Sequence, residues 1–325
     1  MNRKLFILIL FFAQVCVSQT DSLPFRSYKE NLVIHSSLGY NAAPFSLTGD
    51  FGQVNKLKYR ANLNPIMGLG VAYKWFALNV NFKLPGYVRN TTNYGRTNYL
   101  DLTMKFGIKK WFFNIDLHAY RGFGIKDANL ISENLPVSSR NILLNDQLNT
   151  FSFSINGYRF HKKGFKMKPA LGIVGRYLKK SSSFYIKYTT NIHGIDAANK
   201  IMPHTYFEND KAIHRSNNIS AFDFGAVPGW AHINNINGWQ YGILAGLGGV
   251  IQTKTYSFDG TNRGFLGLAP RLDLKVQGGY NVDSWFLMLT SSFDNKSIRF
   301  NEFQYQQVYY YLRLTYGYRF KKNKK

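Results

Sequence analysis

A two-residue alternation of apolar and polar side chains is the feature that most limits how this chain can fold. In the segment 100–108 every even position is apolar, and every odd position is polar or glycine. Comparable alternation recurs in five further segments, namely 56–63, 76–84, 111–119, 268–280 and 308–320. Successive side chains of a β-strand point to opposite faces, whereas a helix would mix the two sets on every face. The chain is therefore predicted to be all-β, with one apolar and one polar face on each strand.

Such strands occur in two architectures, which differ in where the apolar face points. The apolar segments have the length of roughly 9–11 residues that a tilted strand needs to cross a bilayer. Their polar faces carry full charges in mid-strand, which suits a water-filled lumen. We therefore predict a transmembrane antiparallel β-barrel. The alternative is a soluble secreted β-sandwich, whose apolar faces would point inward and which would dissolve without detergent.

Short turns and long loops alternate along the chain, as they do at the two rims of outer-membrane barrels. Tight turns are expected at 74–75, 109–110, 161–164 and 281–284, and long loops at 85–97, 121–149, 251–265 and 295–303. Trp75, Trp111 and Trp285 each open a strand at a short turn. These three tryptophans are predicted to form an aromatic girdle at one rim.

Twelve strands are predicted, an even number that returns the C-terminus of the chain to the side of the membrane where the N-terminus starts. They are expected at 31–41, 56–75, 76–84, 98–108, 111–120, 150–160, 166–178, 182–192, 237–250, 266–280, 284–294 and 304–320. The segment 193–236 does not fit this count, because both its ends fall on the short-turn side. It forms either a periplasmic or lumen-inserted excursion or two further strands, one at 219–227, which would make fourteen.

The first eighteen residues, 1–18, are predicted to be a secretory signal peptide. A short positive start precedes an apolar stretch from Leu5 to Val17, and small polar residues follow. Cys16 is the only cysteine and would leave with this peptide, so no disulfide is expected in the mature chain. The remainder is predicted to be one barrel domain, 19–320, with a basic tail, 321–325. The predicted location is the outer membrane of a bacterium.

The charge balance favours a basic lumen. The chain has 41 Lys+Arg against 17 Asp+Glu, a formal net charge of +24. Basic residues predicted on the lumen face are Lys56, Lys58, Arg60, Lys83, Lys105, Lys187, Arg271, Lys275, Arg313 and Arg319, against Asp101, Asp116 and Asp273. A low-dielectric wall would focus their positive potential and favour an anionic small solute, in a pore or a pocket. The alternative is a narrow lumen sealed by paired charges and trapped water.

The sequence gives little support for a nucleic acid partner, a cofactor, a metal or a catalytic site. The remaining lysines cluster in turns and in the tail, where they would meet anionic lipid headgroups, so no nucleic acid partner is expected. No cofactor, metal or catalytic site is predicted, and the protein is not expected to be an enzyme. His35 and Ser37 share a strand face, but no orienting group or oxyanion hole stands at a fixed offset from them. A barrel-embedded lipid-modifying enzyme is the alternative function.

Several short motifs resemble a family of uncharacterised bacterial outer-membrane barrels. They are Tyr59-Arg60-Ala61-Asn62, Gly68-Leu69-Gly70-Val71-Ala72-Tyr73-Lys74-Trp75, Phe82-Lys83-Leu84-Pro85, Tyr120-Arg121-Gly122-Phe123, Lys179-Lys180-Ser181-Ser182-Ser183-Phe184 and Pro228-Gly229-Trp230. The resemblance covers most of the mature chain. It implies one secreted barrel domain and carries no activity over.

The function expected from these observations is passive or structural. We expect a narrow channel, a ligand-holding barrel or the membrane anchor of an envelope complex, in contact with outer-membrane lipid and the barrel-assembly machinery. The final strand resembles the aromatic-terminated closing strand of such barrels but runs on past Phe320.

Overall fold

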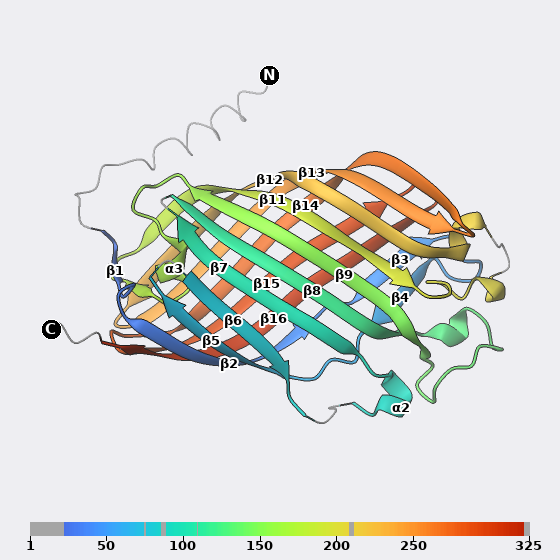
Figure 1. Ribbon diagram of the computed structural model, residues 1–325, viewed down its shortest axis with the longest axis horizontal. Coiled ribbons are helices and arrows are strands. Elements are labelled where there is room, and N and C mark those ends of the chain that lie inside the picture. Colours follow the sequence, from blue (N-terminus) through green and yellow to red (C-terminus); the bar gives the residue numbers. More distant parts are fainter. Residues whose placement is uncertain (1–22, 75, 86–88, 109, 208–210, 322–325) are drawn as a thin grey trace, which may run out of the picture.

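Twelve antiparallel strands close into a ring (Figure 1). The computed structural model describes residues 23–321 except 75, 86–88, 109 and 208–210. The ring consists of β2 (Leu32–Ala42), β5 (Ile66–Tyr73), β6 (Phe76–Lys83), β7 (Asn98–Ile108), β8 (Trp111–Lys126), β9 (Leu143–Phe160), β11 (Ser181–Ala197), β12 (Ser216–Ile236), β13 (Trp239–Phe258), β14 (Thr261–Asn281), β15 (Trp285–Arg299) and β16 (Phe303–Phe320). Pairing between β16 and β2 closes it. The predictions for the signal peptide, Trp75 and residues 322–325 lie outside the described residues.

The predicted count of twelve is confirmed, although one predicted wall strand is absent and a segment without an assigned strand supplies another. The segment 166–178 is not a wall strand, because it forms the short helix α3 (Met167–Ala170) and β10 (Gly175–Tyr177). Pro169 and Gly172, at φ +79°, interrupt an extended course there. The excursion predicted for 193–236 is wrong, because β11 and β12 occupy most of it and include the strand expected at 219–227.

Two further boundaries also differ from prediction. The long loop expected at 251–265 is absent from the described chain, because β13 and β14 run on to a tight turn at Asp259-Gly260, where both residues have positive φ. The single strand expected at 56–75 is divided into β4 (Lys56–Arg60) and β5, with a break that contains Pro65. Proline removes a ladder donor, which accounts for the interruption.

A second closure operates at the long-loop end of the barrel, opposite the short turns between neighbouring strands. β3 (Phe45–Gly49) continues the line of β2 and pairs with β16, and β4 pairs with both β3 and β8. At this long-loop end, β3 and β4 therefore replace β5, β6 and β7 in the wall (Figure 1). The loops here carry α2 (Thr91–Tyr94), η1 (Ala128–Leu130), η2 (His204–Tyr206) and η3 (Ala212–Arg215).

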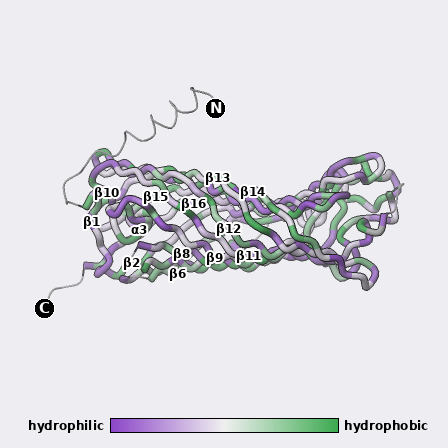
Figure 2. The backbone as a smooth tube through the Cα atoms, turned by 90° about the horizontal axis from the view of Figure 1, so that it is seen from above, coloured by the Kyte–Doolittle hydropathy of each residue, from purple (hydrophilic) through white to green (hydrophobic). Residues whose placement is uncertain are grey.

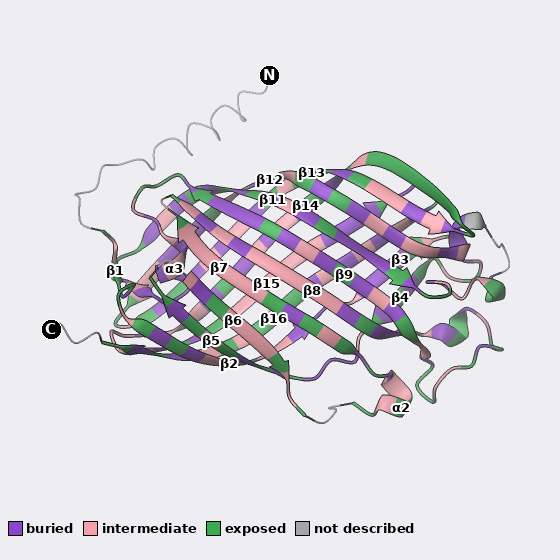
Figure 3. Ribbon diagram, viewed as in Figure 1, coloured by how far each residue is buried: buried purple, intermediate pink, exposed green. Residues whose placement is uncertain are grey.

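Apolar side chains cover the outside of the barrel. On β16 the residues Leu312, Leu314 and Tyr316 are exposed, whereas Arg313 and Thr315 between them face the lumen. Hydrophobic and hydrophilic positions alternate along the strands in Figure 2, and Figure 3 shows the matching alternation of exposure. This arrangement is that of a transmembrane β-barrel and not that of a soluble sandwich. No helix among the described residues is long and apolar enough to cross a membrane.

Candidate functional site

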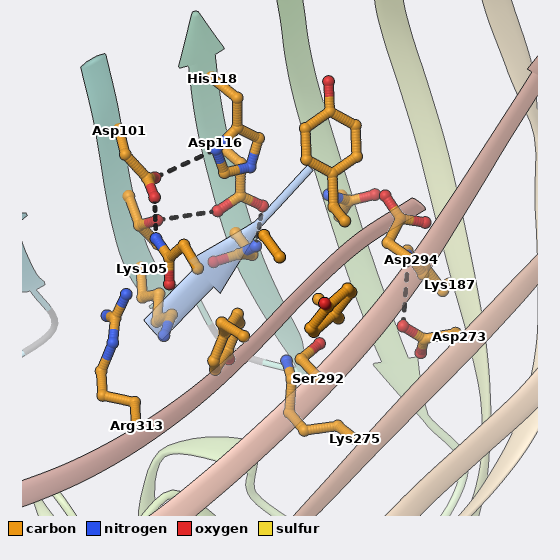
Figure 4. Close-up of a pocket in the computed structure, with 18 of the residues that line it drawn as sticks. Asp101, Lys105, Asp116, His118, Lys187, Asp273, Lys275, Ser292, Asp294 and Arg313 are labelled. Carbon is orange, nitrogen blue, oxygen red and sulfur yellow. Dashed lines mark hydrogen bonds and ion pairs between the residues drawn. The ribbon is translucent and has the colours of Figure 1, made fainter. Parts of the chain in front are cut away.

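The middle of the lumen contains a polar cavity of about 80 Å³. Eight charged side chains line it, namely Asp101, Asp116, Asp273, Asp294, Lys105, Lys187, Lys275 and Arg313 (Figure 4). They project from β7, β8, β11, β14, β15 and β16. A cavity of this size has room for roughly five to eight water-sized groups. It can therefore hold several waters or one small solute.

Asp273 is the most fully engaged acid of the cavity. Its carboxylate accepts hydrogen bonds from Tyr185 Oη at 2.8 Å and Tyr158 Oη at 3.1 Å, and it pairs with Lys187 Nζ at 3.1 Å. The Tyr185 side chain lies over the neighbouring strands to reach Asp273, because Gly229 and Gly246 on those strands leave room for its ring. A Cβ on Gly229 would lie 2.5 Å from Tyr185 Cζ. These glycines therefore position a phenol over the lumen.

Two other acids are also engaged. Asp101 accepts a hydrogen bond from Asn41 and lies 3.0 Å from His118 Nδ1. Asp116 accepts from Thr103 Oγ1 at 3.0 Å and from Asn114. Each of these carboxylates therefore has polar partners of its own, and the fourth acid of the lining, Asp294, lies 3.8 Å from Lys296 Nζ.

Three cations of the cavity lack an acidic partner. Among the described residues, Lys105, Lys275 and Arg313 form no salt bridge within 4.0 Å, and Arg313 Nε has no hydrogen-bond acceptor. The Arg313 guanidinium lies 5.1 Å from the Tyr311 ring centre, and Lys275 Nζ lies 5.9 Å from that of Tyr158. Lys105 and Arg313 lie side by side in Figure 4. Both also line a second cavity of about 60 Å³. The cavity thus brings together four acids and four cations, and three of the cations lie outside ion-pair distance of any acid among the described residues.

A second buried network lies nearer the long-loop end. Asp223 accepts hydrogen bonds from Gln252 Nε2 at 2.7 Å and Asn191 Nδ2 at 3.2 Å, pairs with Arg271, and lies 3.0 Å from His193 Nε2. Sequence analysis missed Asp223 and His193, because both lie in the segment that could not be assigned. The alternation around 219–227 was the signal that could have identified Asp223.

Lys296 bridges the lumen beside this network. Its Nζ lies 3.0 Å from Ser154 Oγ and 3.1 Å from Asn191 Oδ1, and it also bonds Ser152. Lys296 is on β15 and the serines are on β9, which lie five strands apart in the ring. One side chain therefore spans the lumen at this level. Sequence analysis missed Lys296 because it was assigned to a loop.

The predicted basic residues fall into separate groups. Lys105, Lys275 and Arg313 line the cavity, as does Lys187 in its pair with Asp273. Arg271 is buried against Asp223, and Lys83 is half-buried with its Nζ 3.4 Å from Thr97 O.

The lumen assignment of three basic residues on β4 is wrong. Lys56, Lys58 and Arg60 are exposed, because Leu57 and Tyr59 occupy the inward positions of this strand. The lumen face is apolar at this end of the barrel, so the polar face of β4 points outward.

An apolar core closes the long-loop end, and we call it the cap core. Its inward aromatic residues include Phe45 and Tyr59, whose rings stack with centres 4.2 Å apart. The loops contribute Ile131, Leu135, Ile201, Met202, Phe207 and Ile213 to the same buried cluster. The Tyr59 hydroxyl donates to Ile201 O at 2.9 Å, which ties a loop to the wall. Among the described residues, this cluster places packed apolar side chains across the long-loop end of the lumen.

The chain between β9 and β11 closes the short-turn end, and we call its residues 164–178 the plug. Its side chains Phe165, Met167, Ala170, Leu171 and Tyr177 are buried against the wall. The wall also donates to the plug backbone. Gln240 Nε2 donates to Pro169 O at 3.0 Å and Ala170 O at 2.8 Å, and Gln277 donates to Ala170 O as well.

Arg319 is the main polar anchor of the plug. Its guanidinium donates to Gly172 O, to Ile173 O at 3.1 Å and to Asn281 Oδ1 at 2.7 Å. Arg319 is buried, and its side chain is committed to these acceptors. It was predicted to line the lumen, and the structure directs its charge to the plug instead.

The N-terminal strap, residues 23–31, lies across the plug. Its strand β1 (Phe25–Ser27) pairs with β10. Tyr28 Oη donates to Asp283 Oδ1 at 2.5 Å, and Arg26 and Arg176 pair with the same carboxylate at 2.6 and 3.0 Å. Burial alone would raise the pKa of Asp283, but the Tyr28 hydrogen bond and the Arg176 and Arg26 charges outweigh it and lower that pKa. Burial, aided by Asp283, raises the pKa of Tyr28 to about 12.

Aromatic side chains gather at the short-turn rim. Trp111 faces outward with its ring centre 5.6 Å from that of Tyr188, and Trp285 lies 6.2 Å from Tyr316. Trp239, which was not assigned to the girdle, is 62% exposed at the turn that precedes β13. Contact of these rings with lipid stays a prediction.

The remaining candidate residues form no recognisable reactive arrangement. Within the described chain, His35 Nδ1 and Ser37 Oγ make no hydrogen bond, and the His35 ring lies against Gly70. The described residues also contain no cluster of three His, Cys, Asp or Glu side chains able to hold a metal.

Comparison with known proteins assigns the family. Residues 19–320 match the family described as a domain of unknown function, DUF4421, and the chain belongs to it. No curated protein matches the chain in sequence.

Solved structures with a similar course of the chain are membrane barrels. The outer membrane protease OmpT of Escherichia coli is 9% identical with a TM-score of 0.43, over 93% of this chain and 100% of that one. The toluene transporter TodX of P. putida is 7% identical with a TM-score of 0.27, over 90% and 91%. The monoaromatic hydrocarbon channel CymD is 11% identical with a TM-score of 0.30, over 91% and 90%. At these values the likeness transfers no activity.

Proposed function

We propose that this member of the DUF4421 family is an outer-membrane barrel that holds a small anion in a closed lumen. One observation carries the proposal. Lys105, Lys275 and Arg313 surround a cavity between the plug and the lumen network, and none of them has an acidic partner among the described residues. The barrel would therefore retain its ligand and would not conduct ions continuously.

Physical chemistry supports an anion as the missing partner. A cation taken out of water is costly unless an opposite charge or several hydrogen-bond acceptors compensate it. The four acids of the lining have other partners, since Asp101, Asp116 and Asp273 accept hydrogen bonds and Asp294 lies 3.8 Å from Lys296 Nζ. An anion with several oxygens would accept hydrogen bonds from Arg313 and both lysines. The size of the cavity limits it to a few heavy atoms.

Binding of sulfate and phosphate to the purified barrel tests this proposal. The barrel should be refolded with each anion and studied by calorimetry, so that slow entry does not mask binding. We expect saturable binding that Lys275→Met weakens by about tenfold or more, since one charge-assisted contact is lost. The matched variant Lys56→Met, which removes an exposed lysine outside the lumen, should bind as the wild type does. Absence of binding, or equal weakening in both variants, would reject an anion in this cavity.

We further propose that the barrel acts without chemistry on its ligand, in contact with outer-membrane lipid and after insertion by the barrel-assembly machinery. Its apolar exterior and the aromatic residues at the short-turn rim support that location. Fractionation of cells tests it. The protein should occur in the outer-membrane fraction and migrate faster on a gel unboiled than boiled. A single unshifted band in the soluble fraction would contradict it.

A further inference from the structure

We propose that the short-turn mouth of the barrel contains a second site, which binds an anionic single-chain amphiphile. The ligand is a hydrocarbon chain with one carboxylate or phosphate headgroup. The site lies between the plug and the wall, outside the lumen cavities, and does not depend on the lumen anion. We call it the mouth pocket.

The mouth pocket is the first observation behind this inference. It has a volume of about 670 Å³, against about 80 Å³ for the lumen cavity. Its apolar lining comes from the strap, the wall and the plug, namely Leu23, Phe25, Phe112, Phe160, Phe165, Met167 and Val174. Small-molecule sites are typically of this size and mostly apolar, with a few polar groups that fix orientation. The interior therefore suits a hydrocarbon chain.

The charges of the mouth pocket determine which headgroup fits. Five lysines line it, namely Lys29, Lys74, Lys110, Lys166 and Lys168. They come from the strap, two short turns and the plug, so separate parts of the chain bring them together. The one acid in the lining, Glu30, lies 3.9 Å from Lys29. A negative headgroup is therefore favoured over a neutral or positive one.

Lys168 links the apolar and the charged parts of the mouth pocket. It lies on α3, half-buried, with its Cε 3.7 Å from where a Cβ on Gly107 would stand. Burial lowers the pKa of Lys168 to about 8. An anionic headgroup beside it would favour the charged form, which adds to the attraction. The hydrocarbon chain would then lie along Phe112, Phe160 and Phe165, and each buried methylene would favour binding.

A larger side chain at Gly107 would fill part of the mouth pocket without displacing the wall strands. It faces inward on β7, and an added Cβ would meet only Trp111 O at 3.5 Å and Lys168 Cε at 3.7 Å. Both are ordinary contact distances, so a larger side chain would extend into the space assigned to the ligand. Gly107→Leu is therefore a variant expected to fold and to exclude a chain.

Quenching of a tryptophan at position 112 by a brominated chain tests the inference, because Phe112 lines the mouth pocket whereas the ring of Trp111 faces outward. Phe112→Trp is made in a barrel whose five native tryptophans are replaced by phenylalanine, and the protein is placed in phosphatidylcholine nanodiscs. The probes are 11-bromoundecanoate and its trimethylammonium counterpart, with dodecyl phosphate as a competitor. We expect saturable quenching by the carboxylate, and binding of the cationic probe weaker by about tenfold or more. Displacement by dodecyl phosphate would show that phosphate and carboxylate headgroups share the site, and failure to displace would restrict the ligand to carboxylates.

Matched variants separate the mouth pocket from simple partition into lipid. Lys166→Met with Lys168→Met should weaken binding by about tenfold or more, and Gly107→Leu should abolish it. Lys162→Met with Lys163→Met removes two exposed lysines from the same connection and should change nothing. Quenching that does not saturate, or that is equal for all variants and both probes, would overturn the inference. Faster gel migration of each unboiled variant checks that it has folded. If Gly107→Leu does not fold, the comparison of the two lysine double variants tests the inference. Sulfate should not displace the brominated carboxylate from the mouth pocket. The outcome is therefore independent of whether the lumen binds an anion.

Discussion

The two ends of the barrel are closed by different physical means. At the long-loop end, the cap core buries aromatic and aliphatic side chains from strands and loops together. At the short-turn end, buried side chains of the plug are joined by polar wall residues that donate to its backbone carbonyls, above all Arg319 and Gln240. Apolar closure spreads its free energy over many contacts, whereas polar closure concentrates it in a few donors. We therefore expect single substitutions to affect the two ends differently.

The largest effect is expected at the cap core. Phe45 is buried, and its ring centre lies 4.2 Å from Tyr59, 5.1 Å from Phe123 and 5.5 Å from Tyr305. Phe45→Ala should lower the free energy of unfolding by about 3–5 kcal/mol, since it leaves a cavity. Urea unfolding in detergent measures this. The matched variant Phe82→Ala, at a half-exposed position on the outer face, should cost much less. Equal losses would mean that the cap core is not packed as described.

A smaller but more local effect is expected at the plug. Arg319→Met leaves the carbonyls of Gly172 and Ile173 without this donor, which should cost about 2–3 kcal/mol. Hydrogen exchange should rise in the plug, residues 164–178, and stay unchanged in the cap core. Arg313→Met removes an arginine from the same strand without a bond to the plug, and should leave plug exchange as in the wild type. Faster exchange throughout the barrel would contradict a local anchor.

The smallest effect is expected at the strap, where it depends on pH. The lowered pKa of Asp283 means that its contribution is fully present above the ordinary Asp pKa of about 3.9 and is lost as pH falls through the Asp283 pKa. The raised pKa of Tyr28 gives a second limit, with loss as pH rises through about 12. Proteolysis of the strap should therefore accelerate below about pH 4. Asp283→Asn should be cleaved faster than the wild type at pH 7 and should lose the acid dependence. If Asp283→Asn kept the wild-type acid dependence of proteolysis, that dependence would belong to another titrating group.

The same contrast explains how far the sequence could be interpreted. Period-two alternation predicts the ring, because each wall strand has lipid on one side and lumen on the other. It fails at the plug and at β4, where both neighbours are protein. Met167 alternates with Lys166 and Lys168 as a strand residue would, but Met167 and Leu171 pack into the mouth as part of a helix and a turn. On β4, Leu57 and Tyr59 look outward-facing by the membrane rule but belong to the cap core.

The sequence predicted that basic residues line the lumen, but only some of the residues named for this role do so. Lys105, Lys275 and Arg313 follow from strand phase alone, and the structure places them around one cavity. Their lack of acidic partners depends on which strands face each other across the ring, and this is set by tertiary structure. Asp223 lies in a segment that was not assigned and Lys296 in one that was assigned to a loop, and their contacts, which join β12 with β14 and β15 with β9, are likewise set by tertiary structure.

Ion conductance across a planar bilayer tests the central claim most directly. The account predicts that the wild-type barrel, closed by the cap core and the plug, gives no sustained conductance steps in symmetric salt. Stable, ohmic steps from the wild-type protein would contradict it, because they would require a continuous water path past both the plug and the Lys296 bridge.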